Sequence, residues 1–131
     1  MKPLPTALPL ERPYWEHAQS HRLALQRCDR CQVFRFPASP VCAECDSDQY
    51  TWTDLCGTGT LVSWVIFHKS YFVSFNDAIP YNVALVKVDE GPILCTNVID
   101  IDNDALKTGM RLKVVFVDVN EQFSIPKFVP L

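Results

Sequence analysis

The sequence predicts a mainly β protein in which a short N-terminal helix and a small metal-stabilised unit precede a five-stranded barrel. Two observations favour this order. Four cysteines form the pairs Cys28-x2-Cys31 and Cys42-x2-Cys45, and segments rich in β-branched and aromatic residues follow residue 57. With 131 residues, 48% of them hydrophobic and 21% charged, the chain has the size and composition of one compact globular core with a small appendage.

The first 22 residues are expected to form an extended arm and a helix. Residues 1–9 contain three prolines, which remove N–H donors and disfavour the helical conformation of the preceding residue. Residues 10–21 predict a short helix beginning near Pro13, with Tyr14, Trp15 and Ala18 as its apolar stripe. The arm lacks the continuous apolar region of a secretory signal, so we expect a cytoplasmic chain.

Residues 23–55 are expected to form a zinc ribbon. Thiols in a reducing compartment more often bind metal than form disulfides, and two Cys-x2-Cys pairs supply the four sulfurs of a closed tetrahedral site. We therefore predict that Cys28, Cys31, Cys42 and Cys45 are ligands of a structural Zn²⁺. The same ligand set suits iron. Two disulfides and a redox-active dithiol pair are the other interpretations. Cys56 and Cys95 lie outside this spacing and are expected to be small buried hydrophobic residues.

Residues 56–131 are expected to form the barrel. Asp102, Asn103 and Asp104 can cap one helical turn before the fourth strand. Five strands with a small helix before one of the last two favour an OB-fold, although a small sandwich fits the periodicity nearly as well. The predicted strands are Thr60–His68, Tyr81–Val88, Ile93–Ile99, Arg111–Val119 and Ser124–Val129.

Catalytic motifs are not evident in the sequence. There is no Gly-rich phosphate loop, no GxSxG and no HExxH. His17 and His21 are four residues apart on the predicted helix, but without a third ligand nearby we interpret them as solvent-facing. Twelve basic against 15 acidic side chains give a net charge of −3, which argues against avid binding of duplex nucleic acid.

The connection between the first two barrel strands is unusually aromatic for a loop. It either packs over a barrel end or forms a ligand or partner surface, since OB-folds bind through loops and the adjacent sheet face. Aromatic rings there could stack on a base or an adenine ring, and Lys69 could pair with phosphate.

The order of these features resembles a known family, the zinc-ribbon/OB-fold proteins of acyl-CoA metabolism. Members are found beside thiolases, 3-hydroxy-3-methylglutaryl-CoA synthases, lipid-transfer-protein-like aldolases and MaoC-like hydratases. The resemblance departs at residues 36–40, where the usual Pro-Pro-Arg is replaced. It rests on Tyr14-Trp15, Leu25 to Cys31, Phe36-Pro37, Cys42-x2-Cys45, Trp52, Gly57 to Val62, Ile79-Pro80-Tyr81, Asp89 to Pro92, Gly109-Met110 and Pro126 to Pro130.

This resemblance implies a rubredoxin-like zinc ribbon followed by an OB-fold. It also implies a non-catalytic accessory subunit that binds the coenzyme A (CoA) part of an acyl-CoA and scaffolds a thiolase-superfamily acyltransferase, thiolase or aldolase. The family pattern offers no sharp motif for the CoA contact, and on chemistry alone its candidates are His68, Lys69, Phe72 and Tyr81. The alternatives are a single-stranded nucleic-acid-binding module, since zinc ribbons and OB-folds are both common there, and an electron carrier with iron in the ribbon. An independent small enzyme is the remaining class.

Overall fold

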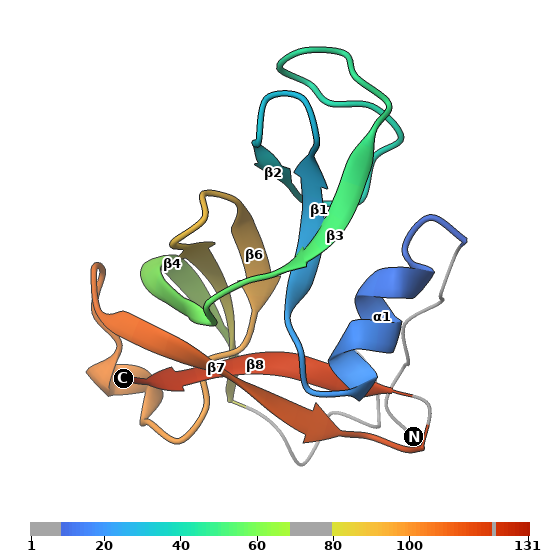
Figure 1. Cartoon of the computed structure of the whole chain (residues 1–131). Coiled ribbons are helices and arrows are strands. Elements are labelled where there is room, and N and C mark those ends of the chain that lie inside the picture. Colours follow the sequence, from blue (N-terminus) through green and yellow to red (C-terminus); the bar gives the residue numbers. More distant parts are fainter. Residues whose placement is uncertain (1–8, 69–79, 122) are drawn as a thin grey trace.

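Eight strands form two antiparallel sheets in the residues that the structure describes, namely 9–68, 80–121 and 123–131 of this computed structural model. A three-stranded sheet has the order β2-β1-β3, and a five-stranded sheet has the order β6-β5-β4-β7-β8. The first sheet rises from the second in Figure 1, with helix α1 beside it. The predicted fold class, a short helix and a zinc ribbon followed by an OB-like barrel, is confirmed.

Helix α1 spans Arg12–Gln19 and is shorter than the predicted segment 10–21. Pro13 lies in its first turn, and after its last residue His21 adopts a positive φ of 60°, which prevents the helix from continuing. Ala18 is buried, and the side chain of Gln19 donates to the carbonyl of Glu121 at 2.6 Å. The helix therefore joins the ribbon to the β7–β8 end of the barrel.

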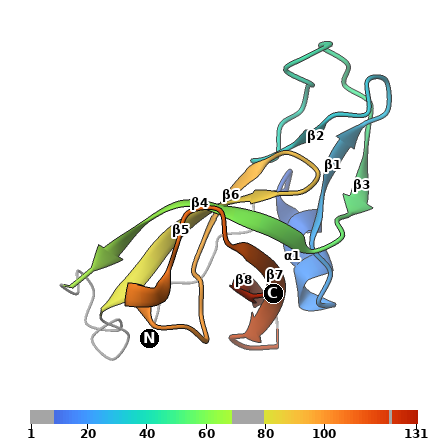
Figure 2. The ribbon, with the colours of Figure 1, turned by 90° about the vertical axis from the view of Figure 1, so that its left-hand side faces the viewer.

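The ribbon sheet comprises β1 (Ala24–Cys28), β2 (Phe34–Arg35) and β3 (Tyr50–Asp54). The Leu23 and Leu25 side chains belong to the same hydrophobic cluster as the barrel core, and the amide of Leu55 donates to the carbonyl of Leu23 at 2.7 Å. The two cysteine-bearing loops lie at the end of this sheet that points away from the barrel (Figures 1 and 2). One end of the ribbon is thus held by the shared core, and the other depends on the cysteines.

The barrel strands agree within two residues with those expected from the sequence, except that the third ends at Thr96 and not at the predicted Ile99. A short 3-10 helix, Asn103–Ala105, occupies the predicted helical turn. Gly59 is required in the first strand, because a Cβ there would lie 2.8 Å from the carbonyl oxygen of Lys87. The strands are β4 (Thr58–Phe67), β5 (Tyr81–Val88), β6 (Ile93–Thr96), β7 (Arg111–Asp118) and β8 (Ser124–Pro130).

The five-stranded sheet curls so that its two edge strands approach each other. Strand β4 pairs with β5 over residues 59–67 but with β7 only at residues 58–60, and a bulge interrupts its register with β5 between Leu61 and Ser63. A parallel bridge joins Val98 to Phe128, and the Thr96 hydroxyl donates to the carbonyl of Pro126 at 3.1 Å. Bulges bend strands and promote closure, which explains how one long strand serves both halves of the barrel.

A buried asparagine fixes the chain where the sheet curls. Asn82 is 4% exposed, and its Oδ1 accepts from the amide of Val98 at 2.8 Å. Its Nδ2 donates to the carbonyl of Val98 at 2.7 Å and to Oδ1 of Asn103 at 3.0 Å. The backbone after β6 therefore takes its hydrogen bonds from a side chain on β5.

Candidate functional site

The two Cys-x2-Cys segments fold into matching turns. In the first, the amide of Gln32 donates to the carbonyl of Cys28 at 3.0 Å, and in the second the amide of Asp46 donates to the carbonyl of Cys42 at 2.9 Å. Gln32 and Asp46 both have positive φ values, 69° and 62°. Each segment is thus a tight turn that aims its two thiols to one side, as metal-binding knuckles require.

The four sulfurs converge on one point. The Sγ atoms of Cys28, Cys31, Cys42 and Cys45 all lie within 4.8 Å of one another. The pairs Cys28–Cys45 and Cys31–Cys42 are each 3.5 Å apart. Four ligands at the usual Zn–S distance would be about 3.8 Å apart at the corners of a tetrahedron. The cluster is therefore consistent with a structural zinc ion.

The backbone helps to stabilise thiolates in this cluster. The pKa of Cys28 is lowered to about 6, first by the N–H of Cys31, which points at its sulfur at 3.5 Å. The pKa of Cys42 is lowered by the backbone N–H groups of Glu44 and Cys45. The pKa values of Cys31 and Cys45 are raised instead, so the backbone N–H groups favour the thiolate form at Cys28 and Cys42. Zinc binds thiolates and not thiols, so these N–H groups prepare two of the four ligands.

The two remaining cysteines are exposed, which corrects the expectation that they are buried. Leu94 points inward at 3% exposure, so the alternation of strand β6 turns Cys95 outward. Cys56 lies at the junction between the ribbon and the barrel, where its sulfur is 3.2 Å from the Thr58 hydroxyl. Neither Cys56 nor Cys95 is therefore a buried core residue.

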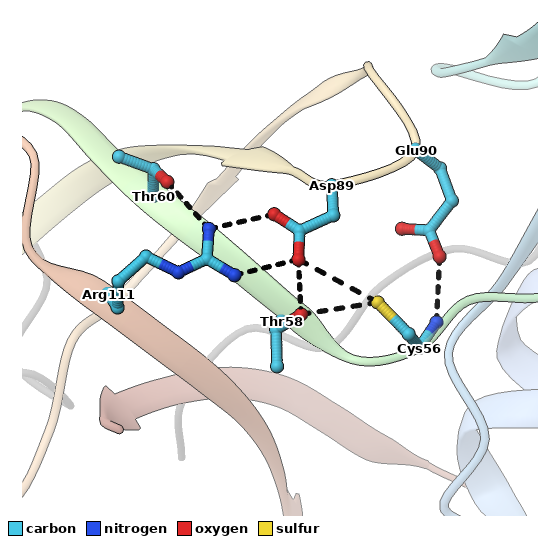
Figure 3. A network of polar contacts seen from close by, with 6 residues as sticks. All are labelled: Cys56, Thr58, Thr60, Asp89, Glu90 and Arg111. Carbon is cyan, nitrogen blue, oxygen red and sulfur yellow. Dashed lines mark hydrogen bonds and ion pairs between the residues drawn. The ribbon is translucent and has the colours of Figure 1, made fainter.

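A polar network surrounds Cys56 (Figure 3). Arg111 on β7 forms a two-pronged ion pair with Asp89, with N–O distances of 2.8 and 2.7 Å, and also donates to Thr60. The amide of Cys56 donates to Glu90 at 2.8 Å. Arg111 and the Thr58 hydroxyl hold the pKa of Asp89 well below its usual range. Because this carboxylate is already paired, it is a poor proton acceptor for the thiol, and the network ties β4, β7 and the β5–β6 turn together.

The two helix histidines point to different partners. His17 Nδ1 lies 2.6 Å from the carbonyl of Pro13, and its half-buried ring stacks on Trp52. His21 is exposed and lies 2.7 Å from Asp118. His21 is therefore solvent-facing as expected, whereas His17 packs on the ribbon.

The predicted CoA-contacting residues are only partly within the described structure. His68 follows β4 and Tyr81 begins β5, where Tyr81 pairs with Phe67 and stacks on its ring at 5.1 Å. Lys69 and Phe72 lie outside the described residues. His68 lines an open hollow of about 490 Å³, together with Ile66, Pro80, Ile101 and residues 102–104. Asp102 and Asp104 make this hollow acidic, which disfavours phosphate groups inside it.

An apolar surface on the barrel was not anticipated from the sequence. We call it the outer face: the outward side of strands β4 to β6. Val65 is 56% exposed, Leu85 40% and Ile93 47%. Cross-strand pairing places Leu85 between Ser63 and Cys95. The alternation of apolar residues in residues 81–88 suggested one buried side, but the opposite side is also partly apolar, which is typical of surfaces that contact another protein.

Comparison with known families places both halves of the chain. Residues 15–51 match the family described as "ChsH2, rubredoxin-like zinc ribbon domain", and residues 52–117 match "ChsH2, C-terminal OB-fold domain". Their common boundary lies within β3, close to the predicted end of the ribbon at residue 55. The finer division into residues 1–22, 23–55 and 56–131 stays a prediction.

Among curated proteins, the chain is 32% identical over 131 residues to "Probable enoyl-CoA hydratase alpha subunit" of Thermomonospora curvata, covering 99% of this chain but only 40% of that protein. It is also 29% identical to a "DUF35 domain-containing scaffold protein" of Pyrococcus furiosus, covering 82% of this chain and 79% of that one. The likeness to the first relative thus concerns less than half of its length.

Among solved structures, the chain resembles one chain of "Ltp2-ChsH2(DUF35) aldolase", with a TM-score of 0.89 and 31% identity, covering 97% of this chain and 98% of that one. A DUF35-family protein of unknown function from Sulfolobus solfataricus has the same fold, with a TM-score of 0.65 and 14% identity. In the described part of the chain, no helix is long and apolar enough to cross a membrane.

Proposed function

The chain belongs to the ChsH2 family of rubredoxin-like zinc-ribbon and OB-fold proteins, and we propose on this basis that it is an accessory subunit of an acyl-CoA enzyme. The enzyme it would scaffold has a thiolase-type fold and acts as an aldolase, thiolase or acyltransferase. The chain itself would contribute no catalytic group. The observation that carries the proposal is the likeness, over nearly the full length of both chains, to one chain of the Ltp2-ChsH2(DUF35) aldolase.

The outer face supports a role in assembly. Val65, Leu85 and Ile93 are each at least 40% exposed and come from three adjacent strands. Burying such side chains against a partner would contribute about 25 cal/mol per Å² of apolar surface. We propose that this face docks on the partner enzyme.

The proposal includes contact with the CoA part of an acyl-CoA. His68 and Tyr81 lie at the same end of the β4–β5 pair. Ile66 and Ile101 line the hollow beside His68, and Asn103 supplies an amide. This lining suits the neutral pantetheine arm better than the phosphates, because Asp102 and Asp104 repel anions. We therefore propose pantetheine as the part of CoA that this hollow contacts.

We also propose that Cys28, Cys31, Cys42 and Cys45 hold a structural Zn²⁺. The convergence of their sulfurs supports this assignment. A site closed by four thiolates leaves no position for water, so the ion would supply folding free energy and no hydrolytic chemistry. It would fix the outer end of the ribbon, which the shared core does not reach.

Co-expression with thiolase-fold proteins encoded in the same genome tests the assembly. We expect one of them to co-purify with this chain and to lose most of its activity without it. Leu85→Asp on the outer face should abolish co-purification. Val119→Asp is the matched control and should not, because Val119 is similarly exposed, at 42%, but lies outside the outer face. Full activity of the isolated partner would contradict the proposal. Retention on single-stranded oligonucleotide at low salt would instead favour the nucleic-acid alternative.

Calorimetric titration of the assembled complex tests the CoA contact. Both CoA and pantetheine should bind, and Ile101→Asp should weaken both to a similar degree if the hollow holds the shared arm. Binding of CoA with no detectable binding of pantetheine would contradict this assignment, because it would place the recognition on the phosphates or the adenine.

A further inference from the structure

Three donor nitrogens are buried together in the ribbon without an acceptor. Nε2 of Gln26 and both Nη atoms of Arg35 have no hydrogen-bond partner among the described residues. The orientation of the Gln26 amide is fixed, because its Oε1 accepts from Nε of Arg35 at 3.0 Å and from the amide of Ser39 at 2.8 Å. Gln26 is 0% exposed, so Nε2 cannot turn to bulk solvent.

The charge of Arg35 is also not neutralised by a direct ion pair. In residues 9–68, 80–121 and 123–131, no ion pair involves this guanidinium. Its carbon atom lies 4.8 Å from the centre of the Tyr50 ring, which compensates part of the charge but uses none of the Nη donors. Burying charged donors without acceptors is costly, so this cluster is suited to an anion.

A cavity of about 120 Å³ lies beside this cluster, between helix α1 and the ribbon sheet. Arg35 and Trp52 line it, and both are direct cross-strand partners of Gln26, so the three side chains share one face of the sheet. The other walls are apolar and largely aromatic, formed by Tyr14, Trp15, Leu25, Phe36, Pro37 and Ala38. The volume is comparable to a cavity that holds one benzene ring.

We propose that this cavity binds a monocarboxylate carried on a small flat apolar group. Arg35 is the member of this cluster that lines the cavity, and the carboxylate accepts from its Nη atoms, which turn toward the cavity to match it in a two-pronged geometry. The apolar group lies between the aromatic walls. This site does not depend on the proposed partnership, on the hollow beside His68 or on the metal.

Glu11 lines the same cavity and defines the charge that it accepts. Its carboxylate repels a dianion such as phosphate more strongly than a singly charged acid. Glu11 is the N-cap of helix α1 but its side chain makes no capping hydrogen bond, so its replacement leaves the helix intact. Glu11→Gln should therefore tighten the binding of a monocarboxylate.

Benzoate and its neutral isostere benzamide test the proposal on the full chain at constant ionic strength. Fluorescence reports on binding, since Trp15 and Trp52 line the cavity. We expect benzoate to bind saturably with a dissociation constant in the range of about 1 to 10 mM, and benzamide to bind about tenfold more weakly. Arg35→Met should remove this preference, whereas Arg27→Met, on the opposite face of the same sheet, should retain it.

Two further probes identify the source of the acid. N-acetylphenylalanine imitates the carboxyl terminus of a protein, and its amide is the matched control. Tighter binding of N-acetylphenylalanine than of benzoate would indicate that the site takes the chain end of a partner protein. Tighter binding of benzoate would indicate that it takes a free metabolite, and either result supports the site. Equal binding of benzoate and benzamide, or no saturable binding of either acid, would overturn the proposal and assign the buried donors to water.

Discussion

Replacing Asn82 with alanine tests how the barrel is held at its curled edge. The substitution removes the acceptor of the Val98 amide and the donor to its carbonyl, at distances of 2.8 and 2.7 Å. Val98 is 2% exposed, so water cannot readily replace these partners. Each buried group left without a partner costs about 1–3 kcal/mol, and we therefore expect Asn82→Ala to reduce the free energy of unfolding by about 2–5 kcal/mol.

Urea unfolding monitored by both tryptophan fluorescence and circular dichroism measures this loss. Asn103→Ala is the matched control, because it removes only the 3.0 Å bond to Asn82 and a weaker one to Pro80 and should cost about 1 kcal/mol. If Asn82→Ala cost no more than Asn103→Ala, the Val98–Phe128 bridge alone would hold this edge, and the reasoning from the buried asparagine would be wrong.

Three further predictions concern the metal, acid stability and a buried tyrosine. The purified protein should be colourless and contain one zinc ion per chain, and stoichiometric iron would contradict the zinc assignment. Cys42→Ser should abolish metal binding and disorder the ribbon loops, while the NMR resonances of the barrel persist. Because the folded pKa of Asp89 is depressed by Arg111 and Thr58, its stabilisation is full above the unfolded pKa of about 3.9 and is lost as pH falls toward the folded value. The difference in urea midpoint between the wild type and Asp89→Asn should accordingly stay constant from about pH 7 to 5 and shrink below about pH 4; growth of that difference on acidification would refute the sign. Burial raises the pKa of Tyr14 to about 12, so one tyrosine should ionise later than the others in an absorbance titration, and Tyr14→Phe should remove that late phase.

The elements and the metal cluster could be predicted because short-range patterns specify them. Two cysteines separated by two residues can reach one ion only through a tight turn, and the structure supplies that turn twice, with Gln32 and Asp46 in the left-handed region. Likewise, β-branched and aromatic runs bounded by Gly and Pro predicted β5 at its observed limits, Tyr81–Val88. Such features depend on neighbouring residues and need no knowledge of the rest of the fold.

Which side of a strand faces the core could not be predicted in the same way, because it depends on what packs against that strand. Apolar residues and a cysteine alternate without a clear polar side in ILCT, so the exposure of Cys95 followed only from the pairing of β6 with β5, which turns Leu94 toward the core and Cys95 outward. The acidic lining beside His68 likewise required residues 102–104 to fold back against the end of β4.

Residue spacing in the sequence therefore determined the strands, the knuckles and the order of ribbon and barrel. The tertiary structure decided which polar groups are buried and what they meet. Asn82 finds Val98 sixteen residues away, whereas Gln26 and Arg35 meet across a strand pair and leave three donors without an acceptor. The physical reason is that hydrogen-bond satisfaction and burial are properties of groups brought together by folding, and no local pattern specifies which groups those will be.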